Sequence, residues 1–153
     1  MTAGRPVTYI ATASARDDAE MAARIAAHQA RRPPGWTLVE EPIALAAAVT
    51  AHARGDGCVL VECLTLWLTN LLVADDPAAL DREQTALLSV LDTAPGELIL
   101  VGNETGMGIV PLGELTRRYC DAAGRLHQDI AARCERVLLT VAGLPLALKG
   151  DSP

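Results

Sequence analysis

The sequence contains no phenylalanine, only two tryptophans and two tyrosines, and only one lysine, Lys149, among its 13 lysine and arginine residues. Half of the 153 residues are nevertheless apolar, so Leu, Val, Ile and Ala must fill the core of one compact domain. The scarcity of lysine also excludes every motif that requires this residue before position 149.

Positive charge and paired cysteines are scarce as well. The formal net charge of −6 disfavours nucleic acid and anionic membranes as partners. We expect no secretory signal, and Glu62 and Asn70 interrupt the longest apolar run (58–74), which a membrane-spanning helix rarely tolerates. The four cysteines form no C-x-x-C pair and no metal-ligand spacing with histidine, so we expect buried free thiols, no protein metal site and a soluble, cytoplasmic protein.

Short apolar runs alternate with longer amphipathic ones, which predicts a single α/β domain over residues 1–153. Largely apolar runs are typical of parallel strands buried on both faces, so we expect a three-layer parallel sheet with helices on both faces. The expected strands are 7–11, 58–62, 98–102 and 137–141, with a short edge strand at 146–148. The expected helices are 43–53, 77–92, 113–134 and one before residue 31 whose capping box is Asp17 and Glu20.

Polar or glycine-rich stretches follow three of these strands, and the carboxyl ends of parallel strands meet at one edge. They are "ATAS" (11–14), Glu62 and the loop "GNETGMGIVP" (102–111), whose glycines would let backbone N–H groups approach an anion. Glu62 could hold Mg²⁺ or a ribose hydroxyl, or it could cap the next helix at Cys63–Leu64. Glu104 could act in the same ways or pair with an arginine.

The stretch "MAARIAAHQARRPPGW" (21–36) places His28 near a helix end beside Arg31 and Arg32. A neutral histidine can attack an electrophile such as phosphorus, and the two arginines would favour the neutral ring and stabilise charge on phosphate oxygens. The alternative is a solvated histidine that interacts with the helix C-terminus. His52 and His127 have no partner that the sequence identifies.

Four blocks of the chain resemble the bifunctional adenosylcobinamide kinase/adenosylcobinamide-phosphate guanylyltransferase family of cobalamin biosynthesis. The resemblance runs in order from Val7 to Gly150. Its blocks are "YIATAS…DDAEMAARIAAHQARRPPGWTLVEEP", "VLVECLTLWLTNLL", "NETGMGIVP" and "GRLHQDIAARCERVLLTVAGLPLALKG". It implies a RecA-like fold of the P-loop NTPase type and a homotrimer whose nucleotide site lies near a subunit boundary.

The resemblance also implies roles for particular residues. His28 would accept GMP from GTP as a covalent intermediate and pass it to adenosylcobinamide phosphate, giving adenosylcobinamide-GDP. GTP and ATP would be the nucleotide substrates, with Mg²⁺ accompanying GTP. The residues implied in nucleotide binding are Thr12, Ala13, Ser14, Gln29, Ala30, Arg31, Arg32, Glu40 and Glu62.

One departure from the family is that the sequence contains no G-x-x-x-x-G-K-[ST] phosphate loop, because Lys149 follows Leu148 rather than a glycine. The chain starts at the family's second strand, so we expect the first strand and the P-loop to be missing and the kinase step to be lost. We also expect exposed apolar edges on neighbouring strands, with hydrophobic exposure or oligomerisation as the result.

Three explanations of this departure are open. The chain could be a shortened form of a longer protein, or another polypeptide could supply the missing first strand and P-loop. The third possibility is a natural relative of the family that has lost the triphosphate chemistry. We expect the first. Two functions follow. The chain is the body of a guanylyltransferase, which the retained His28 favours, or it is a catalytically inactive corrinoid-binding or subunit-assembly module, which the missing P-loop favours.

Overall fold

The structure is a computed structural model that describes residues 4–14 and 19–151. Asp17, half of the expected capping box, lies outside these ranges. In chain order the elements are β1 (Val7–Ala11), α1 (Ala19–Arg31), β2 (Thr37–Glu40), α2 (Leu45–His52), β3 (Cys58–Glu62), α3 (Leu64–Leu72), α4 (Ala79–Leu91), β4 (Glu97–Val101), α5 (Glu114–Arg133), β5 (Val137–Val141) and β6 (Leu144–Lys149).

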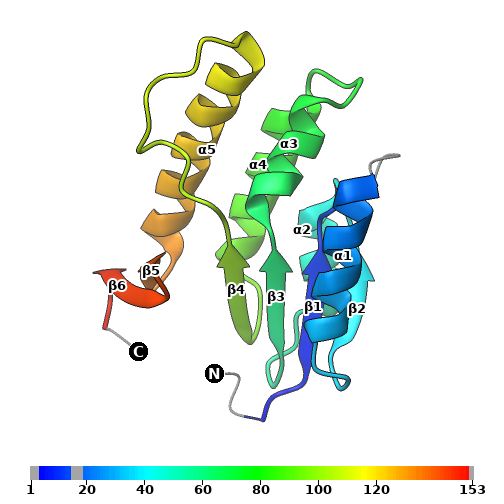
Figure 1. Cartoon of the computed structure of the whole chain (residues 1–153). Helices are drawn as coiled ribbons and strands as arrows, with labels where there is room; N and C mark the ends of the chain where they lie inside the picture. Colours follow the sequence, from blue (N-terminus) through cyan, green and yellow to red (C-terminus); the bar gives the residue numbers. More distant parts are fainter. Residues whose placement is uncertain (1–3, 15–18, 152–153) are drawn as a thin grey trace.

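Four strands form one parallel sheet in the order β2-β1-β3-β4, with helices packed around it (Figure 1). This confirms the prediction of an α/β fold. All four strands point the same way, so the segments that follow them emerge at one edge. In register, Ala11 of β1 lies between Glu40 of β2 and Glu62 of β3.

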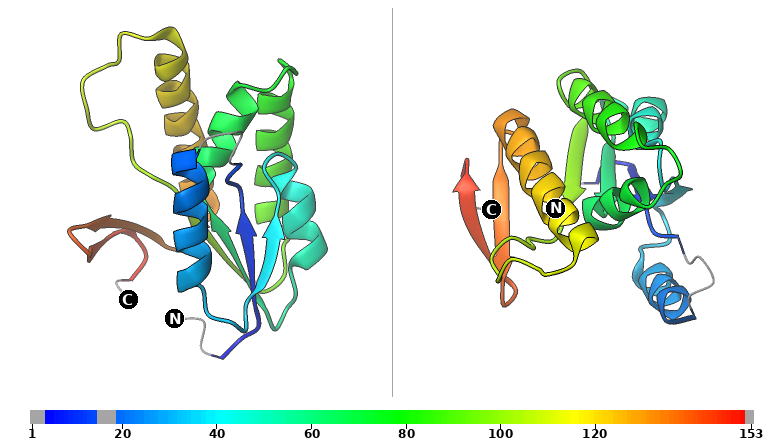
Figure 2. Two further views of the ribbon diagram at one scale, coloured as in Figure 1. Left: turned by 45° about the vertical axis from the view of Figure 1, so that its right-hand side comes forward. Right: turned by 90° about the horizontal axis from the view of Figure 1, so that it is seen from above.

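The two faces of the sheet are covered unequally. Alternate residues such as Ile10, Val59 and Val61 point into the main core, beneath α2, α3 and α4, and are at most 3% exposed. Helix α1 lies on the opposite face (Figure 2), and none of its residues is buried among the described part of the chain. Helix α1 therefore covers this face of the sheet only partly, and space accessible to solvent remains between the helix and the strands.

The C-terminal strands correct one prediction. β5 was expected in the parallel sheet, but it pairs antiparallel with β6 as a separate two-stranded hairpin. Ala142 (φ 52°) and Gly143 (φ 77°) form its two-residue turn, and positive φ at both positions is typical of tight hairpins. A short loop of this kind cannot make the crossover that a parallel neighbour requires. The expected strand at 146–148 is the middle of β6.

Two further expectations differ from the structure. Residues 37–40 form β2, an edge strand that the sequence analysis did not predict. Of the four cysteines expected to be buried, only Cys58 is; the other three are half-buried, and all four are free thiols. Among the described residues no helix is both long enough and apolar enough to cross a membrane.

Candidate functional site

The site lies between α1 and the sheet, over the middle of β1 and the carboxyl half of β3. Residues Cys58, Leu60 and Glu62 alternate onto the face of β3 that α1 covers, and Tyr9 does the same on β1. A hollow of about 230 Å³ opens there. Its lining residues are Tyr9, His28, Arg31, Arg32, Pro33, Trp36, Leu60 and Glu62.

The Pro-Pro-Gly stretch (33–35) explains why residues on both sides of it, His28 and Arg32 before it and Trp36 after it, line the same hollow. α1 ends at Arg31, and proline at positions 33 and 34 removes the amide hydrogens that would continue the helix. The amide of Trp36 then donates to the carbonyl of Pro33 (3.1 Å), which closes a turn. This turn returns the chain to the sheet, where the Trp36 ring stacks on Tyr9 with 6.3 Å between centroids.

His28 faces a carboxylate across the hollow. Its Nδ1 lies 3.6 Å from Oε1 of Glu62, although the two residues are far apart in sequence. The His28 side chain is 57% exposed, so a ligand can reach the ring from solvent. The contact gives His28 a partner on the sheet, and its exposure is also what the alternative of a solvated helix-end histidine predicts. Glu62 does not cap α3, because the N-cap of that helix is Cys63 and makes no side-chain capping bond.

Tyr9 holds the other oxygen of this carboxylate. Its hydroxyl donates to Oε2 of Glu62 at 2.7 Å. Burial and this bond to a negatively charged acceptor raise the pKa of Tyr9 to about 12. The Arg32 guanidinium lies over the Tyr9 ring, 4.1 Å from its centroid, and opposes that rise. The buried Nε of Arg32 has no hydrogen-bond partner in the described residues, and the residue itself belongs to the lining of the hollow.

The other residues expected to bind nucleotide lie around the hollow rather than in its lining. Thr12 is fully buried, and its hydroxyl donates to the Cys63 carbonyl (2.7 Å) and accepts from the Cys63 amide (2.9 Å). Its side chain therefore joins the loop after β1 to the start of α3. The remaining residues are Ala13 and Ser14 in that loop, Gln29 and Ala30 on the exposed surface of α1, and Glu40 at the end of β2.

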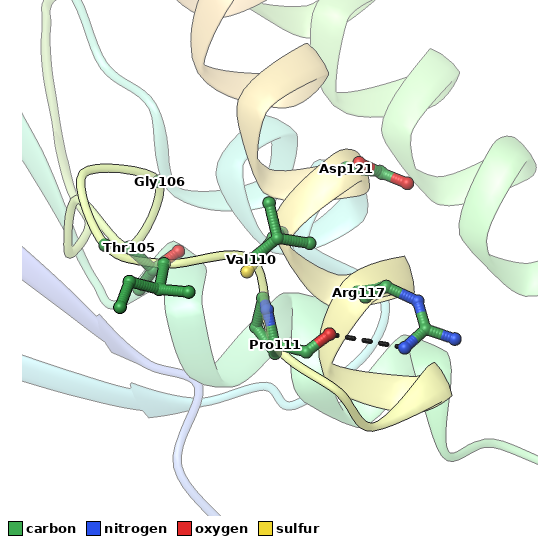
Figure 3. Close-up of a pocket in the computed structure, with 9 residues that line it drawn as sticks. Thr105, Gly106, Val110, Pro111, Arg117 and Asp121 are labelled. Carbon is green, nitrogen blue, oxygen red and sulfur yellow. Dashed lines mark hydrogen bonds between the residues drawn. The ribbon is translucent and has the colours of Figure 1, made fainter.

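A second hollow, of about 460 Å³, lies beside the glycine-rich loop that follows β4. Figure 3 draws the nine residues that line it and labels six of them, namely Thr105, Gly106, Val110, Pro111, Arg117 and Asp121. Arg117 of α5 donates to the carbonyl of Pro111 (3.2 Å) and so holds the loop to the helix. Glu104 in the same loop pairs with His127, with 3.8 Å between Oε2 and Nδ1, and not with an arginine.

Comparison with known proteins gives a family. Residues 1–148 match the model of cobinamide kinase/cobinamide phosphate guanyltransferase. The chain belongs to this family. It is 62% identical over 148 residues to a bifunctional adenosylcobalamin biosynthesis protein of Pseudomonas aeruginosa, covering 97% of this chain and 85% of the relative.

More distant members of the family agree. A bifunctional adenosylcobalamin biosynthesis protein of Salmonella typhimurium is 40% identical over 156 residues, and one of Escherichia coli is 38% identical. Each alignment covers 94% of this chain and 86% of the relative. The predicted family is therefore confirmed, and with it the prediction that the chain is related to enzymes that use nucleotides and cobinamide.

The sequence analysis did not name four of the lining residues as site candidates: Tyr9, Pro33, Trp36 and Leu60. Tyr9 stands in a strand and resembles a core residue in the sequence, while Trp36 follows the Pro-Pro-Gly stretch and carries no group typical of catalysis. Their place beside His28 follows from strand register and from the turn at 33–36, neither of which a single sequence specifies. With the register of β1 and β3 known, Tyr9 could have been found, because it lies on the same face of the sheet as Glu62.

The part of the chain that the structure describes contains no group of three or more His, Cys, Asp or Glu side chains placed to hold an ion. Magnesium in nucleotide enzymes usually needs only one or two protein carboxylates, because substrate phosphates and water complete its shell. Glu62 is the carboxylate of the hollow, but its two oxygens already face Tyr9 and His28, so a magnesium ion that arrives with a nucleotide would be held by the phosphates and water.

Proposed function

We propose that this chain transfers GMP from GTP to adenosylcobinamide phosphate through a covalent intermediate on His28. One observation carries the proposal: His28 lies in a hollow that also contains Glu62, Arg31 and Arg32. A nucleophilic histidine needs a partner that orients its ring, and a phosphorus centre needs cations that stabilise charge on its oxygens. Family membership supports guanylyl transfer as the reaction class.

The reaction would run in two displacements. A lone pair on the His28 ring attacks the α-phosphorus of GTP, forming an N–P bond while the bond from that phosphorus to the bridging oxygen breaks and pyrophosphate leaves. An oxygen of adenosylcobinamide phosphate then attacks the same phosphorus. The N–P bond breaks, its electron pair returns to the ring, and adenosylcobinamide-GDP is released.

The chain's own residues would divide this work. Arg31 and Arg32 would bind phosphate oxygens, and the place of both side chains in the lining of the hollow supports this role. Glu62 would orient His28 or receive a ribose hydroxyl, while Glu40, Thr12, Ala13, Ser14, Gln29 and Ala30 would form the surrounding nucleotide surface. Bound Mg²⁺ would neutralise triphosphate charge. The hollow is below the ~300–1,000 Å³ of ordinary ligand sites, so it would hold only one part of the nucleotide.

We also propose that this chain does not perform the kinase step. The sequence contains no G-x-x-x-x-G-K-[ST] motif, and Lys149 is its only lysine. In P-loop enzymes that motif supplies the backbone cradle and the lysine that bind the β- and γ-phosphates. The nucleotide is expected to be GTP, the phosphorylated corrinoid to be the acceptor, and a homotrimer in the cytoplasm to be the working form.

Intact-mass measurement tests this function. The parent chain and His28→Ala are incubated with GTP and Mg²⁺, and we expect a mass gain of one GMP in the parent alone. Because the His28 side chain is more than half exposed, His28→Ala should change the free energy of unfolding by less than about 0.5 kcal/mol. His52→Ala is the matched control, since that histidine also ends a helix but lies outside the hollow, and it should keep the gain.

Two results would contradict the proposal. GMP attachment retained in His28→Ala would exclude His28 as the nucleophile. No attachment in the parent would favour the catalytically inactive corrinoid-binding or assembly module.

The loss of the kinase step has its own test. Addition of adenosylcobinamide and ATP to the same incubation should give no phosphorylated corrinoid.

A further inference from the structure

Three side chains form a chain of contacts that ends at the ring of His28. The hydroxyl of Tyr9 donates to Oε2 of Glu62 at 2.7 Å, and Oε1 of the same carboxylate lies 3.6 Å from Nδ1 of His28. The two oxygens thus face different partners, one on a strand and one on a helix. Turning the carboxylate away from His28 would strain or break its bond to Tyr9.

The position of Tyr9 is itself restricted. The residue is 7% exposed, and its ring contacts both the Trp36 ring and the Arg32 guanidinium. Its pKa of about 12 keeps the hydroxyl protonated at neutral pH, so it remains a donor to Glu62. Because the protonated Tyr9 phenol is buried and its ring is contacted by Trp36 and Arg32, its hydrogen bond can restrict the orientation of the partly exposed Glu62 carboxylate.

We propose that Tyr9 is a positioning residue that, by holding Glu62 against Nδ1 of His28, selects the histidine tautomer with its proton on Nδ1. Nε2 then keeps its lone pair and is the atom that attacks phosphorus. As the N–P bond forms, the ring gains positive charge, which the Glu62 carboxylate offsets while the Nδ1 proton stays between them. The role of Nε2 as the attacking atom rests on the proposed guanylyl transfer, whereas the preference of His28 for the Nδ1–H tautomer does not depend on it.

Nitrogen-15 NMR of the chain without nucleotide measures the tautomer directly. Spectra are recorded at increasing pH until the His28 signals stop changing, so that the neutral ring is observed. Comparison with His28→Ala assigns the signal among the three histidines. In the parent we expect the Nδ1–H form of His28 to predominate.

Two variants should change this spectrum in different ways. Tyr9→Phe keeps the ring contacts but removes the hydroxyl, so Glu62 is released and His28 should become a mixture of tautomers. In Glu62→Gln the amide oxygen should accept from Tyr9 and the amide nitrogen should donate to Nδ1, which inverts the preference to Nε2–H. The control is Tyr119→Phe, since Tyr119 is the other tyrosine and its hydroxyl interacts with Thr65 and Thr105 instead. It should match the parent.

The rate of GMP attachment gives the second readout. Loss of a hydrogen bond to a charged group is expected to slow attachment in Tyr9→Phe by about tenfold. The GTP concentration that gives the half-maximal rate should hardly change, because Tyr9 acts on the nucleophile and not on the nucleotide. Tyr119→Phe should keep the parental rate.

The outcomes separate the two proposals. If Tyr9→Phe leaves both the His28 tautomer and the attachment rate unchanged, the positioning role is wrong and guanylyl transfer stands. If the parent attaches no GMP, guanylyl transfer fails, and the NMR spectra alone decide whether Tyr9 controls His28. A parental spectrum dominated by Nε2–H would overturn the positioning role in either case.

Discussion

Thr12 shows how a residue that was predicted to bind nucleotide can serve the fold. Its buried hydroxyl bonds to both backbone groups of Cys63, and its carbonyl accepts from the side chain of Asn70 at 2.8 Å. These bonds tie the end of β1 to the end of β3. They fix the relative position of the loop that begins the predicted nucleotide surface and of Glu62, which precedes Cys63.

We therefore expect Thr12→Val to destabilise the fold. Valine has nearly the same shape but leaves the Cys63 amide and carbonyl without this partner, at a cost of about 1–3 kcal/mol for a buried polar group. Urea denaturation measures the free energy of unfolding. The matched control is Ser14→Ala, two residues away and exposed, which should change it by less than about 0.5 kcal/mol. Equal stability of the two variants would contradict this role of Thr12.

At the scale of single elements, α1 differs from the helices of the main core. It carries His28, yet none of its residues is buried in the described structure, whereas α3 buries five, including Trp67 and Leu71. Local opening costs least where few apolar side chains are buried. The helix that supplies the proposed nucleophile is thus attached weakly to the sheet.

Hydrogen exchange should reveal this difference. We expect the amides of α1 to exchange faster than those of α3, and we expect GTP to slow exchange in α1 if its phosphates bind Arg31 and Arg32. The hairpin β5–β6 serves as the internal control, because it contributes no residue to the hollow and should not respond. Protection of α1 equal to that of α3 without nucleotide would contradict weak attachment.

The elements also show what one sequence can and cannot specify. β1 and β3 were predicted with their observed bounds, because continuous apolar runs are typical of central parallel strands. β2 was missed because it is a four-residue edge strand with only two apolar residues, and β5 was misplaced because its pairing depends on a two-residue turn. The candidate site divides in the same way. His28, Arg31, Arg32 and Glu62 follow from local motifs, whereas the partnership with Tyr9 depends on register.

At the scale of the whole molecule, the sheet ends in an apolar strand. Among the described residues β4 pairs with β3 alone, although its sequence, ELILV, is typical of a strand with neighbours on both sides. Val101 at its end is 38% exposed. The hairpin β5–β6 adds exposed Leu138, Val141, Leu144, Leu146 and Leu148, each at least 40% exposed. An open edge and apolar surface of this kind favour association.

We therefore expect the chain to bind a hydrophobic dye or to form oligomers. Light scattering gives the mass, and dye fluorescence reports the exposed apolar surface. Val101→Lys places a charge at the open edge and should reduce both signals. The control is Val73→Lys, because Val73 is similarly exposed (40%) but follows α3, away from that edge, and should leave both unchanged. A monodisperse monomer that binds no dye would contradict this prediction.

The placement of the two tryptophans makes the chain its own optical reporter. Trp67 is fully buried in the core and donates to the carbonyl of Ile43, so its emission follows unfolding. Trp36 lies at the hollow, stacked on Tyr9, so nucleotide phosphates that displace Arg32 would change its emission while leaving that of Trp67 unaltered. A quench that disappears in Trp36→Phe would therefore follow occupancy of the hollow in real time, without a label on either the chain or the nucleotide.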